Sequence, residues 1–261
     1  MDERPVGIFD SGFGGVSVLR EAVRLLNKEN YIYFGDNANA PYGDKNEEEI
    51  ASLALTCADF LMQRGIKAML LACNTATGTA IRAIRERLSI PVVSIEPAIK
   101  PASEASDGTV LMLATRATTE MERYKKLKSR MRNPERIIDV PCHGLVERIE
   151  SGVFGILEYD DILDKLIGRY KGRKIDGLVL GCTHYVFIKD AIKQYVDKSF
   201  TGKRIFYDGN EATVKQLKRV LNANGLENDN GSANVTFFSS AEMNRVEPLF
   251  DMLLKTGGPL I

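Results

Sequence analysis

The sequence predicts an α/β protein with two pseudo-symmetric domains, each a mainly parallel sheet flanked by helices, and an active site in the cleft between them. First, short apolar runs typical of buried strands alternate with helical patterns along the 261 residues, as in parallel sheets covered by helices. Second, the order strand, helix, strand, helix, strand, helix occurs twice, and each third strand leads to a cysteine, Cys73 or Cys182. Because ligands bind outside the carboxyl ends of such strands, both cysteines are expected at one cleft.

The first half of the chain contains four predicted strands. They are the apolar runs at residues 6–9, 31–34, 69–72 and 91–95. After the first strand, Val16, Leu19, Val23 and Leu26 recur on one face of a predicted helix. Asn46 is the expected cap of the next helix, whose first turn carries three glutamates that suit the helix dipole. A further amphipathic helix follows the third strand.

The second half repeats this alternation. Its strands are predicted at residues 109–113, 137–140, 178–181 and 204–207. Helical patterns lie between them, and one of them starts directly after Cys182. Residues 222–234 are polar and rich in Gly and Asn, which predicts a mobile surface loop. A last strand at residues 235–238 precedes a final helix, for which Ser239 or Ser240 is the expected cap.

The composition disfavours several classes of protein. Lys and Arg together number 35, and so do Asp and Glu, so the net charge of zero gives no indication of nucleic-acid or anionic-membrane binding. The polar residues after Met1 are not a secretory leader, and no apolar run is long enough to span a bilayer. The sequence therefore predicts a soluble cytoplasmic protein that does not bind nucleic acid directly.

The four cysteines predict neither a disulfide framework nor a metal site. They are widely spaced without a C-x-x-C pair, and the histidines are His143 and His184 alone. In a reducing compartment this spacing indicates free thiols, and a zinc site would need a denser set of ligands. Cys57 lies in a helical pattern and is interpreted as core packing. Cys142 follows Pro141 at a strand exit and could line a cleft, but we assign it no chemistry.

Cys73 and Cys182 both stand where a predicted strand gives way to a helix. The free N–H groups and the dipole of a helix start favour anions, so each thiolate should form more easily than the free pKa of about 8.5 implies. The plainer alternative is that both are ordinary buried cysteines, because cysteine is often buried. Two cysteines at equivalent strand ends, each followed by hydroxyl or amide side chains, favour a functional pair.

Two thiols on opposite sides of a small molecule suit the inversion of a carbon centre. One thiolate removes a proton from one face of the carbon and the other thiol delivers a proton to the opposite face. A single base returns the proton to the face from which it came unless the base moves. Polar side chains that could hold carboxylate groups adjoin the cysteines and the first turn: Asn74, Thr75, Thr183, Asp10 and Ser11.

Several motifs occur in a defined order along the chain. They are Asp10-Ser11-Gly12 with Gly14-Gly15, Gly35-Asp36, Ala40-Pro41-Tyr42-Gly43, Ala72-Cys73-Asn74-Thr75-Ala76, Ile95-Glu96-Pro97 and Leu180-Gly181-Cys182-Thr183-His184-Tyr185. Together they resemble the cofactor-independent glutamate racemases, from Val6 to about Ala212. The resemblance implies interconversion of L- and D-glutamate, which supplies D-glutamate for bacterial peptidoglycan, without pyridoxal phosphate, another cofactor or a metal.

The resemblance also implies catalytic roles. Cys73 would deprotonate D-glutamate and Cys182 would deprotonate L-glutamate. Asp10 would support the first thiol and His184 the second, while Glu150 matches a further acidic residue of the family. Substrate-binding positions are implied at Asp10, Ser11, Pro41, Tyr42, Gly43, Cys73, Asn74, Thr75, Thr118, Cys182, Thr183 and His184.

In the family fold, the C-terminal segment completes the first domain. The implied boundaries are residues 1–97 plus 208–261 for the first domain and 98–207 for the second. Family members often form homodimers, so a homodimer is implied. The sequence departs from the family pattern where Val186 replaces a proline, where Ala114 and Ala117 replace glycines, and around Cys142.

Three other functions stay open at this stage. The protein could be a relative that acts on aspartate or another small acid. It could be a dinucleotide-dependent oxidoreductase that uses the glycine turn at residues 12–15 and Asp36, although Ser17 stands where that pattern needs its third glycine. It could also be a binding protein, since some glutamate racemases are said to inhibit DNA gyrase, but nothing in this sequence indicates gyrase as a partner.

Overall fold

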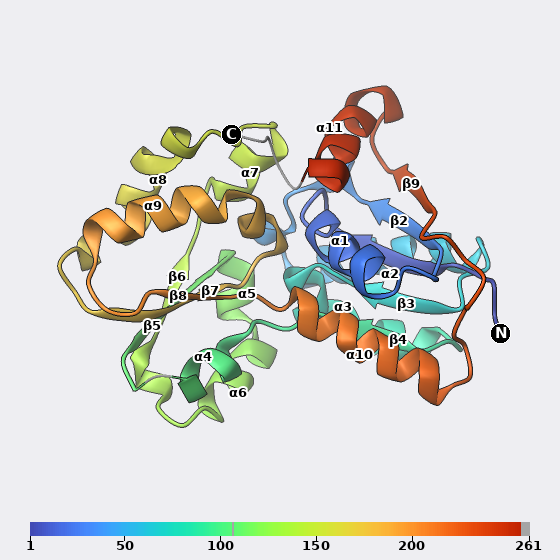
Figure 1. Cartoon of the computed structure of the whole chain (residues 1–261), viewed down its shortest axis with the longest axis horizontal. Helices are drawn as coiled ribbons and strands as arrows, with labels where there is room; N and C mark the ends of the chain where they lie inside the picture. The colour runs from blue at the N-terminus through green and yellow to red at the C-terminus, as the bar shows by residue number, and fades with distance from the viewer. Residues whose placement is uncertain (106, 257–261) are drawn as a thin grey trace.

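The computed structural model describes residues 1–105 and 107–256, which form two sheets flanked by helices (Figure 1). The first sheet has the strand order β4-β3-β1-β2-β9, with β1 (Val6–Asp10), β2 (Tyr31–Gly35), β3 (Ala68–Leu71), β4 (Val92–Ser94) and β9 (Val235–Ser239). The second has the order β6-β5-β7-β8, with β5 (Thr109–Ala114), β6 (Ile137–Pro141), β7 (Ile175–Leu180) and β8 (Ile205–Tyr207). The paired strands run parallel throughout both sheets.

The two sheets share one topology. Numbered within each half, the strands β1 to β4 lie in the spatial order 4-3-1-2, and so do the strands β5 to β8. The strands that lead to the cysteines, β3 and β7, therefore occupy equivalent places, and the predicted duplication is confirmed. Strand β9 adds to the edge of the first sheet beside β2, so the C-terminal segment returns there (Figure 1). The domain boundaries at residues 97/98 and 207/208 stay a prediction.

Helices connect the strands and cover both sheets. On the first sheet they are α1 (Val16–Leu25), α2 (Glu47–Met62), α3 (Asn74–Arg87), α10 (Asn210–Ala223) and α11 (Met243–Thr256). On the second they are α4 (Ile99–Ala105), α5 (Arg116–Glu120), α6 (Glu122–Ser129), α7 (Leu145–Glu150), α8 (Asp160–Ile167) and α9 (Lys189–Ser199). Helix α2 begins with the expected capping box, because Asn46 and Glu49 each bond the other's backbone N–H.

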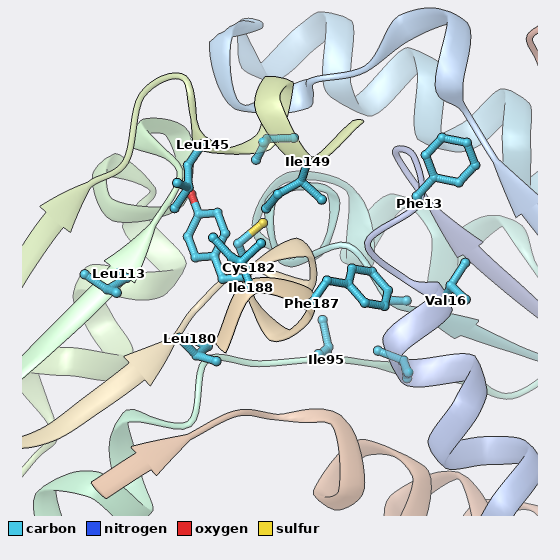
Figure 2. Packing of buried hydrophobic residues seen from close by; sticks show 14 of the residues in the cluster. Phe13, Val16, Ile95, Leu113, Leu145, Ile149, Leu180, Cys182, Phe187 and Ile188 are labelled. Atoms are coloured by element: carbon cyan, nitrogen blue, oxygen red, sulfur yellow. The ribbon is translucent and has the colours of Figure 1, made fainter. Parts of the chain in front are cut away.

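The largest apolar cluster joins the two halves of the molecule. Phe13 and Val16, at the start of α1, belong to the same buried cluster as Ile149 and Phe187 of the second half (Figure 2). Burial of these apolar side chains stabilises the contact between the halves. The contact places the turn before α1 directly against the segment that follows β7.

Two local predictions need correction. The segment after Cys182 is first the 3₁₀ helix η6 (Thr183–Ile188) and only then α9. Helix α11 begins at Met243, so neither Ser239 nor Ser240 caps it, and the Ser240 hydroxyl instead accepts a hydrogen bond from Ala38. The predicted loop is confirmed between α10 and β9, where residues 224–234 have no regular structure, and its mobility stays a prediction; within it Asn228 is buried.

No helix within residues 1–105 and 107–256 combines the length and the apolar character needed to cross a membrane.

Candidate active site

Asp10 joins the first glycine turn to the start of η6, which directly follows Cys182. It is the last residue of β1 and is fully buried. One carboxylate oxygen accepts the N–H of Gly12 at 2.9 Å, and the other accepts the Thr183 hydroxyl at 3.1 Å. Burial raises the pKa of Asp10, although the nearby His184 lowers it in part. The carboxylate is thus held by one contact from each half of the molecule.

The glycines of this turn permit close approach of the second half. A methyl group added at Gly12 would collide with the Glu150 carboxylate, and one added at Gly14 would collide with His184 and the Thr183 hydroxyl. The N–H of Phe13 donates to Glu150 Oε1 at 2.7 Å. The turn therefore does hold an anion, as glycine-rich turns commonly do, but that anion is a side chain of the protein itself.

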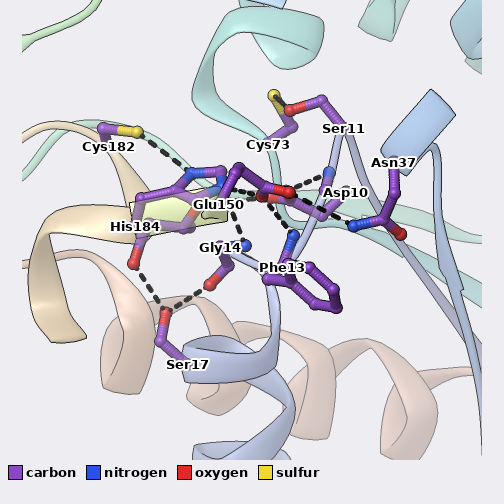
Figure 3. Close-up of polar contacts among 12 residues, drawn as sticks. Asp10, Ser11, Phe13, Gly14, Ser17, Asn37, Cys73, Glu150, Cys182 and His184 are labelled. Carbon is purple, nitrogen blue, oxygen red and sulfur yellow. Dashed lines mark hydrogen bonds and ion pairs between the residues drawn. The ribbon is translucent and has the colours of Figure 1, made fainter. Parts of the chain in front are cut away.

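Cys182, His184 and Glu150 form a continuous chain of polar contacts (Figure 3). His184 Nδ1 lies 3.5 Å from Cys182 Sγ, and its Nε2 lies 2.5 Å from Glu150 Oε1. Burial by itself would lower the pKa of His184, but the negative charges of Cys182 and Glu150 outweigh it and raise that pKa well above its usual value. The imidazole can therefore carry a proton between the sulfur and the carboxylate.

The second ring nitrogen of His184 meets two competing partners. The N–H of Gly14 points to Nε2 at 3.1 Å, on the same nitrogen that faces Glu150. Gly14 can donate only when Nε2 is unprotonated, and a Glu150 carboxylate can accept only when Nε2 carries a proton. The site therefore provides a partner for either protonation state of this histidine. Asn37 also donates to Glu150, at 3.3 Å.

Cys73 has a different environment from Cys182. It caps α3, and its sulfur accepts the N–H of Ala76 and donates to the Ser11 hydroxyl, both at 3.4 Å. Burial and the nearby Asp10 charge nevertheless raise the pKa of Cys73 to about 12. The prediction that the helix start makes this thiolate easier to form is wrong for Cys73 in this structure, because loss of hydration outweighs the two stabilising contacts.

Three threonine hydroxyls form a buried triad across the junction. Thr75 Oγ1 lies 3.0 Å from Thr115 Oγ1 and 3.1 Å from Thr118 Oγ1, and Thr115 donates to Thr118 at 2.9 Å. Thr75 comes from the first half and the other two from the second. Thr115 was not predicted as a site residue, although its position as the cap of α5 directly after β5 was a usable signal. Together these hydroxyls make a compact polar surface.

Asn74 carries a buried polar atom that lacks a partner. Its side-chain oxygen has no hydrogen-bond partner among the described residues, although the side chain is buried. Such an atom costs free energy unless a partner arrives, and so it indicates a place where a ligand group can bind. Asn74 follows Cys73 directly, at the start of α3.

Asp36 holds the loop that contains Pro41, Tyr42 and Gly43. The Tyr42 hydroxyl donates to one oxygen of Asp36 at 2.5 Å, and Asn39 donates to the other at 2.8 Å. Asp36 is buried by these contacts. It therefore has a structural role in this loop and is not free to bind a ribose, which weighs against a dinucleotide enzyme.

A cavity of about 570 Å³ opens beside this site at the junction of the two halves. Pro41 and Asn37 line it from the first half and Glu150 from the second, with Arg245 and Leu249 of α11 as a further wall. The thiols lie deeper and are 5% and 8% exposed for Cys73 and Cys182. The predicted site residues thus converge on one region, with Pro41 at its edge.

The buried carboxylate of Asp10 predicts a pH-dependent effect on stability. Because burial raises its pKa, the folded state binds the proton more tightly than the unfolded chain does. The contribution of protonated Asp10 to the stability of the fold is fully present below about pH 3.9, which is the pKa of an aspartate in the unfolded chain. This contribution is lost as the pH rises through the higher pKa that Asp10 has in the folded state. We therefore expect Asp10→Asn to unfold at a higher temperature than the wild type at pH 8, with a gain that shrinks toward about pH 4.

Thermal unfolding followed by circular dichroism from pH 4 to pH 8 checks this expectation. Asp44→Asn, which changes an exposed carboxylate of the neighbouring loop, is the control and should shift the unfolding temperature little at any pH. A lower unfolding temperature of Asp10→Asn at pH 8 would show that the hydrogen bonds of the carboxylate outweigh its cost of burial.

The comparisons with known proteins agree with this arrangement. The family model for Asp/Glu/Hydantoin racemase matches residues 6–217. The glutamate racemase of Clostridium botulinum (strain Langeland) is 43% identical over 93% of both chains, and that of Clostridium perfringens (strain ATCC 13124) is 41% identical over 96% of both. A solved structure of Francisella tularensis glutamate racemase in complex with D-glutamate has a TM-score of 0.82 at 30% identity, covering 98% of this chain and 95% of that one.

The fold and the family model first define the class, which is that of two-sheet α/β isomerases. The chain belongs to the Asp/Glu/Hydantoin racemase family, and the resemblance to glutamate racemases seen in its motifs is confirmed along most of its length.

Proposed function

We propose that this protein is a glutamate racemase that interconverts L- and D-glutamate by a two-thiol proton transfer at the α carbon without a cofactor. The observation that carries the proposal is the placement of Cys73 and Cys182 after the equivalent strands β3 and β7, within one buried site. Relatives at 41–43% identity that are named glutamate racemases support the choice of substrate. In a bacterial cell the product D-glutamate would enter peptidoglycan.

In the proposed reaction the two thiols exchange roles with direction. With L-glutamate, Cys182 as thiolate takes the α proton, and the thiol of Cys73 delivers its proton to the opposite face of the planar carbanion. With D-glutamate the transfers run in reverse. A pKa of about 12 keeps Cys73 protonated at neutral pH, so the closed site holds it ready as the acid for L-glutamate.

The neighbouring groups would assist each half of the reaction. His184 and Glu150 would take up and return the proton that passes through Cys182, since His184 contacts both. Ser11 would assist Cys73 in another way, because its hydroxyl, 3.4 Å from the sulfur, can accept from the thiol and can turn to donate to the thiolate. Asp10 touches Thr183 rather than Cys73 in the hydrogen-bond network, so we propose that it acts on the first thiol through its charge.

The substrate would bind through polar groups of the site. Some of these groups hydrogen-bond one another in this structure, and one of them lacks a hydrogen-bond partner among the described residues. The threonine triad of Thr75, Thr115 and Thr118 can turn its three hydroxyl protons toward a carboxylate. The free oxygen of Asn74 can accept from the α-ammonium group. Further contacts are proposed from Ser11, Thr183 and the loop that contains Pro41, Tyr42 and Gly43.

We propose that the two halves separate to admit the substrate, because Cys73 and Cys182 are both buried in this structure. We propose that the substrate enters past Pro41 and Glu150, where the cavity of about 570 Å³ already reaches the junction. We also propose that the enzyme acts in the cytoplasm as a homodimer, on the ground of the family resemblance.

The test is the circular-dichroism time course of purified protein with L-glutamate, D-glutamate, L-aspartate and D-aspartate, without any added cofactor. We expect both glutamate enantiomers to approach the same zero signal, and aspartate to change far more slowly. A faster reaction of aspartate would assign the chain to another substrate. Activity only after addition of a cofactor would refute the two-thiol mechanism. Growth of a bacterium that requires D-glutamate, when it expresses this chain, tests the cellular role.

A further inference from the structure

Ser17 makes a buried bridge between the two halves of the molecule. It lies in the first turn of α1, where a dinucleotide-binding turn would have its third glycine. Its hydroxyl lies 2.8 Å from the Gly14 carbonyl and 3.1 Å from the Thr183 carbonyl (Figure 3). Asn210 Nδ2 donates to the same hydroxyl at 3.0 Å. Ser17 and Asn210 are both 4% exposed.

The hydroxyl has one proton to give, and its neighbours direct that proton. Because Asn210 donates to the oxygen, the Ser17 proton must point to one of the two carbonyls. The Gly14 carbonyl already accepts the backbone N–H of Ser17 at 3.1 Å. The bond to Thr183 is the one that joins α1 to the segment after β7. Asn210, at the start of α10, donates to the same Ser17 oxygen and so helps to orient this bond.

The Thr183 carbonyl belongs to the peptide that links Thr183 to His184. On one side of this peptide the Thr183 hydroxyl donates to Asp10 at 3.1 Å. On the other side His184 reaches Cys182 Sγ at 3.5 Å and Glu150 at 2.5 Å. A tilt of this peptide would therefore move the Thr183 hydroxyl, which donates to Asp10. It would also move His184, which relays protons to and from Cys182. Errors of about 1 Å in such positions can cost about 100-fold in rate.

We propose that Ser17, supported by Asn210, is a positioning residue that sets the Thr183–His184 peptide and thereby the proton relay of Cys182. This inference rests on the proposed glutamate racemase function and adds to it a residue outside the contacts with substrate. The alternative is a purely local role, since a serine that bonds the carbonyl three residues earlier is common in helix starts. The two roles predict different isotope effects.

The experiment compares Ser17→Ala with the wild type in both directions, with ordinary glutamate and with glutamate deuterated at the α carbon. If Ser17 positions the Cys182 relay, transfer at Cys182 becomes slower relative to transfer at Cys73. We expect kcat to fall roughly 10- to 100-fold with little change in KM. The primary isotope effect should rise for L-glutamate, whose deuterium Cys182 removes. It should not rise for D-glutamate, whose deuterium Cys73 removes.

Four further variants make the result specific. Ser17→Thr keeps a hydroxyl and should recover most of the lost rate. Asn210→Ala should give a smaller loss of the same kind, and the double variant should be no slower than Ser17→Ala, because Asn210 acts through Ser17. Ser103→Ala, at a buried serine of α4 that lies outside the site's hydrogen bonds, is the matched control and should keep wild-type rates.

Each outcome decides a separate question. A wild type that does not racemise glutamate refutes the proposed function itself. A wild type that racemises glutamate, together with a Ser17→Ala variant that keeps its kcat or changes both isotope effects equally, refutes only the positioning role. Strictly additive losses in Ser17→Ala and Asn210→Ala would also contradict it. Thermal unfolding of every variant shows whether a lost rate reflects an unfolded protein.

Discussion

Replacing Cys73 by alanine should stop racemisation and leave one half of the reaction intact. Cys182 can still remove the α proton of L-glutamate and return a proton to the same face. We therefore expect L-glutamate in D₂O to exchange its α proton without changing configuration, whereas D-glutamate should neither exchange nor racemise. Because a positioned acid or base contributes about 10²- to 10⁴-fold, racemisation should fall by at least about 100-fold.

The corresponding change at Cys182 makes the assignment of the two thiols testable. With Cys182→Ala, D-glutamate should exchange its α proton and L-glutamate should not. Proton NMR of the α position in D₂O measures exchange, and circular dichroism of the same samples measures racemisation. The two variants together therefore separate the base for each enantiomer.

Cys142→Ala is the matched control for these thiol variants. Its sulfur is buried in the second half, burial raises its pKa to about 12 as for Cys73, and it donates to the Val140 carbonyl at 3.2 Å. We expect this variant to keep near-wild-type racemisation. Exchange of both enantiomers in either single-thiol variant would mean that one thiol serves both faces, and the two-thiol mechanism would be wrong.

The fold and the two thiols were predictable because their signals are local. Strands buried on both faces read as short apolar runs, and a cysteine directly follows two such runs in equivalent places. The equivalence of β3 and β7 in the two sheets bears this out. The motif resemblance then added the roles of His184 and Glu150, and these two side chains do lie in contact.

The features that escaped prediction depend on contacts between distant parts of the chain. The anion in the first glycine turn is Glu150, which lies 137 residues after its partner Phe13, and no local pattern reveals such a pairing. The pKa of Cys73 depends on burial in a cluster that includes Phe9 and Tyr42, and this burial outweighs the helix start that the sequence does show. Thr115 becomes part of a triad only when Thr75 is brought against it.

A buried ion pair at the amino end of the first sheet predicts the largest effect on stability. Lys67 Nζ lies 2.6 Å from Glu29 Oε2, and the two side chains are 0% and 5% exposed. The same ammonium group donates to the Asp2 carbonyl at 2.6 Å, and the other Glu29 oxygen accepts the N–H of Asn228 at 3.0 Å. The Lys67–Glu29 ion pair therefore connects both the N-terminal segment and the loop before β9 to the sheet.

Lys67→Ala should destabilise the fold by about 3–5 kcal/mol, because it leaves the Glu29 carboxylate buried without its cation. For a chain of this size that loss lowers the unfolding temperature by on the order of 10 °C. Removal of both charges in Lys67→Met with Glu29→Gln should recover much of the loss, since no unpaired charge then remains in the interior. The measurement is unfolding in urea and by heat for each variant.

Arg87→Ala provides the control, because it breaks an ion pair with Asp59 in which both partners are more than a third exposed. Pairs of this kind contribute about 0–1 kcal/mol, so the variant should unfold close to the wild type. An equally small effect of Lys67→Ala would mean that water reaches Glu29 when the lysine is removed. The loop before β9 would then open easily, and it would behave as the mobile segment that its polar sequence predicts.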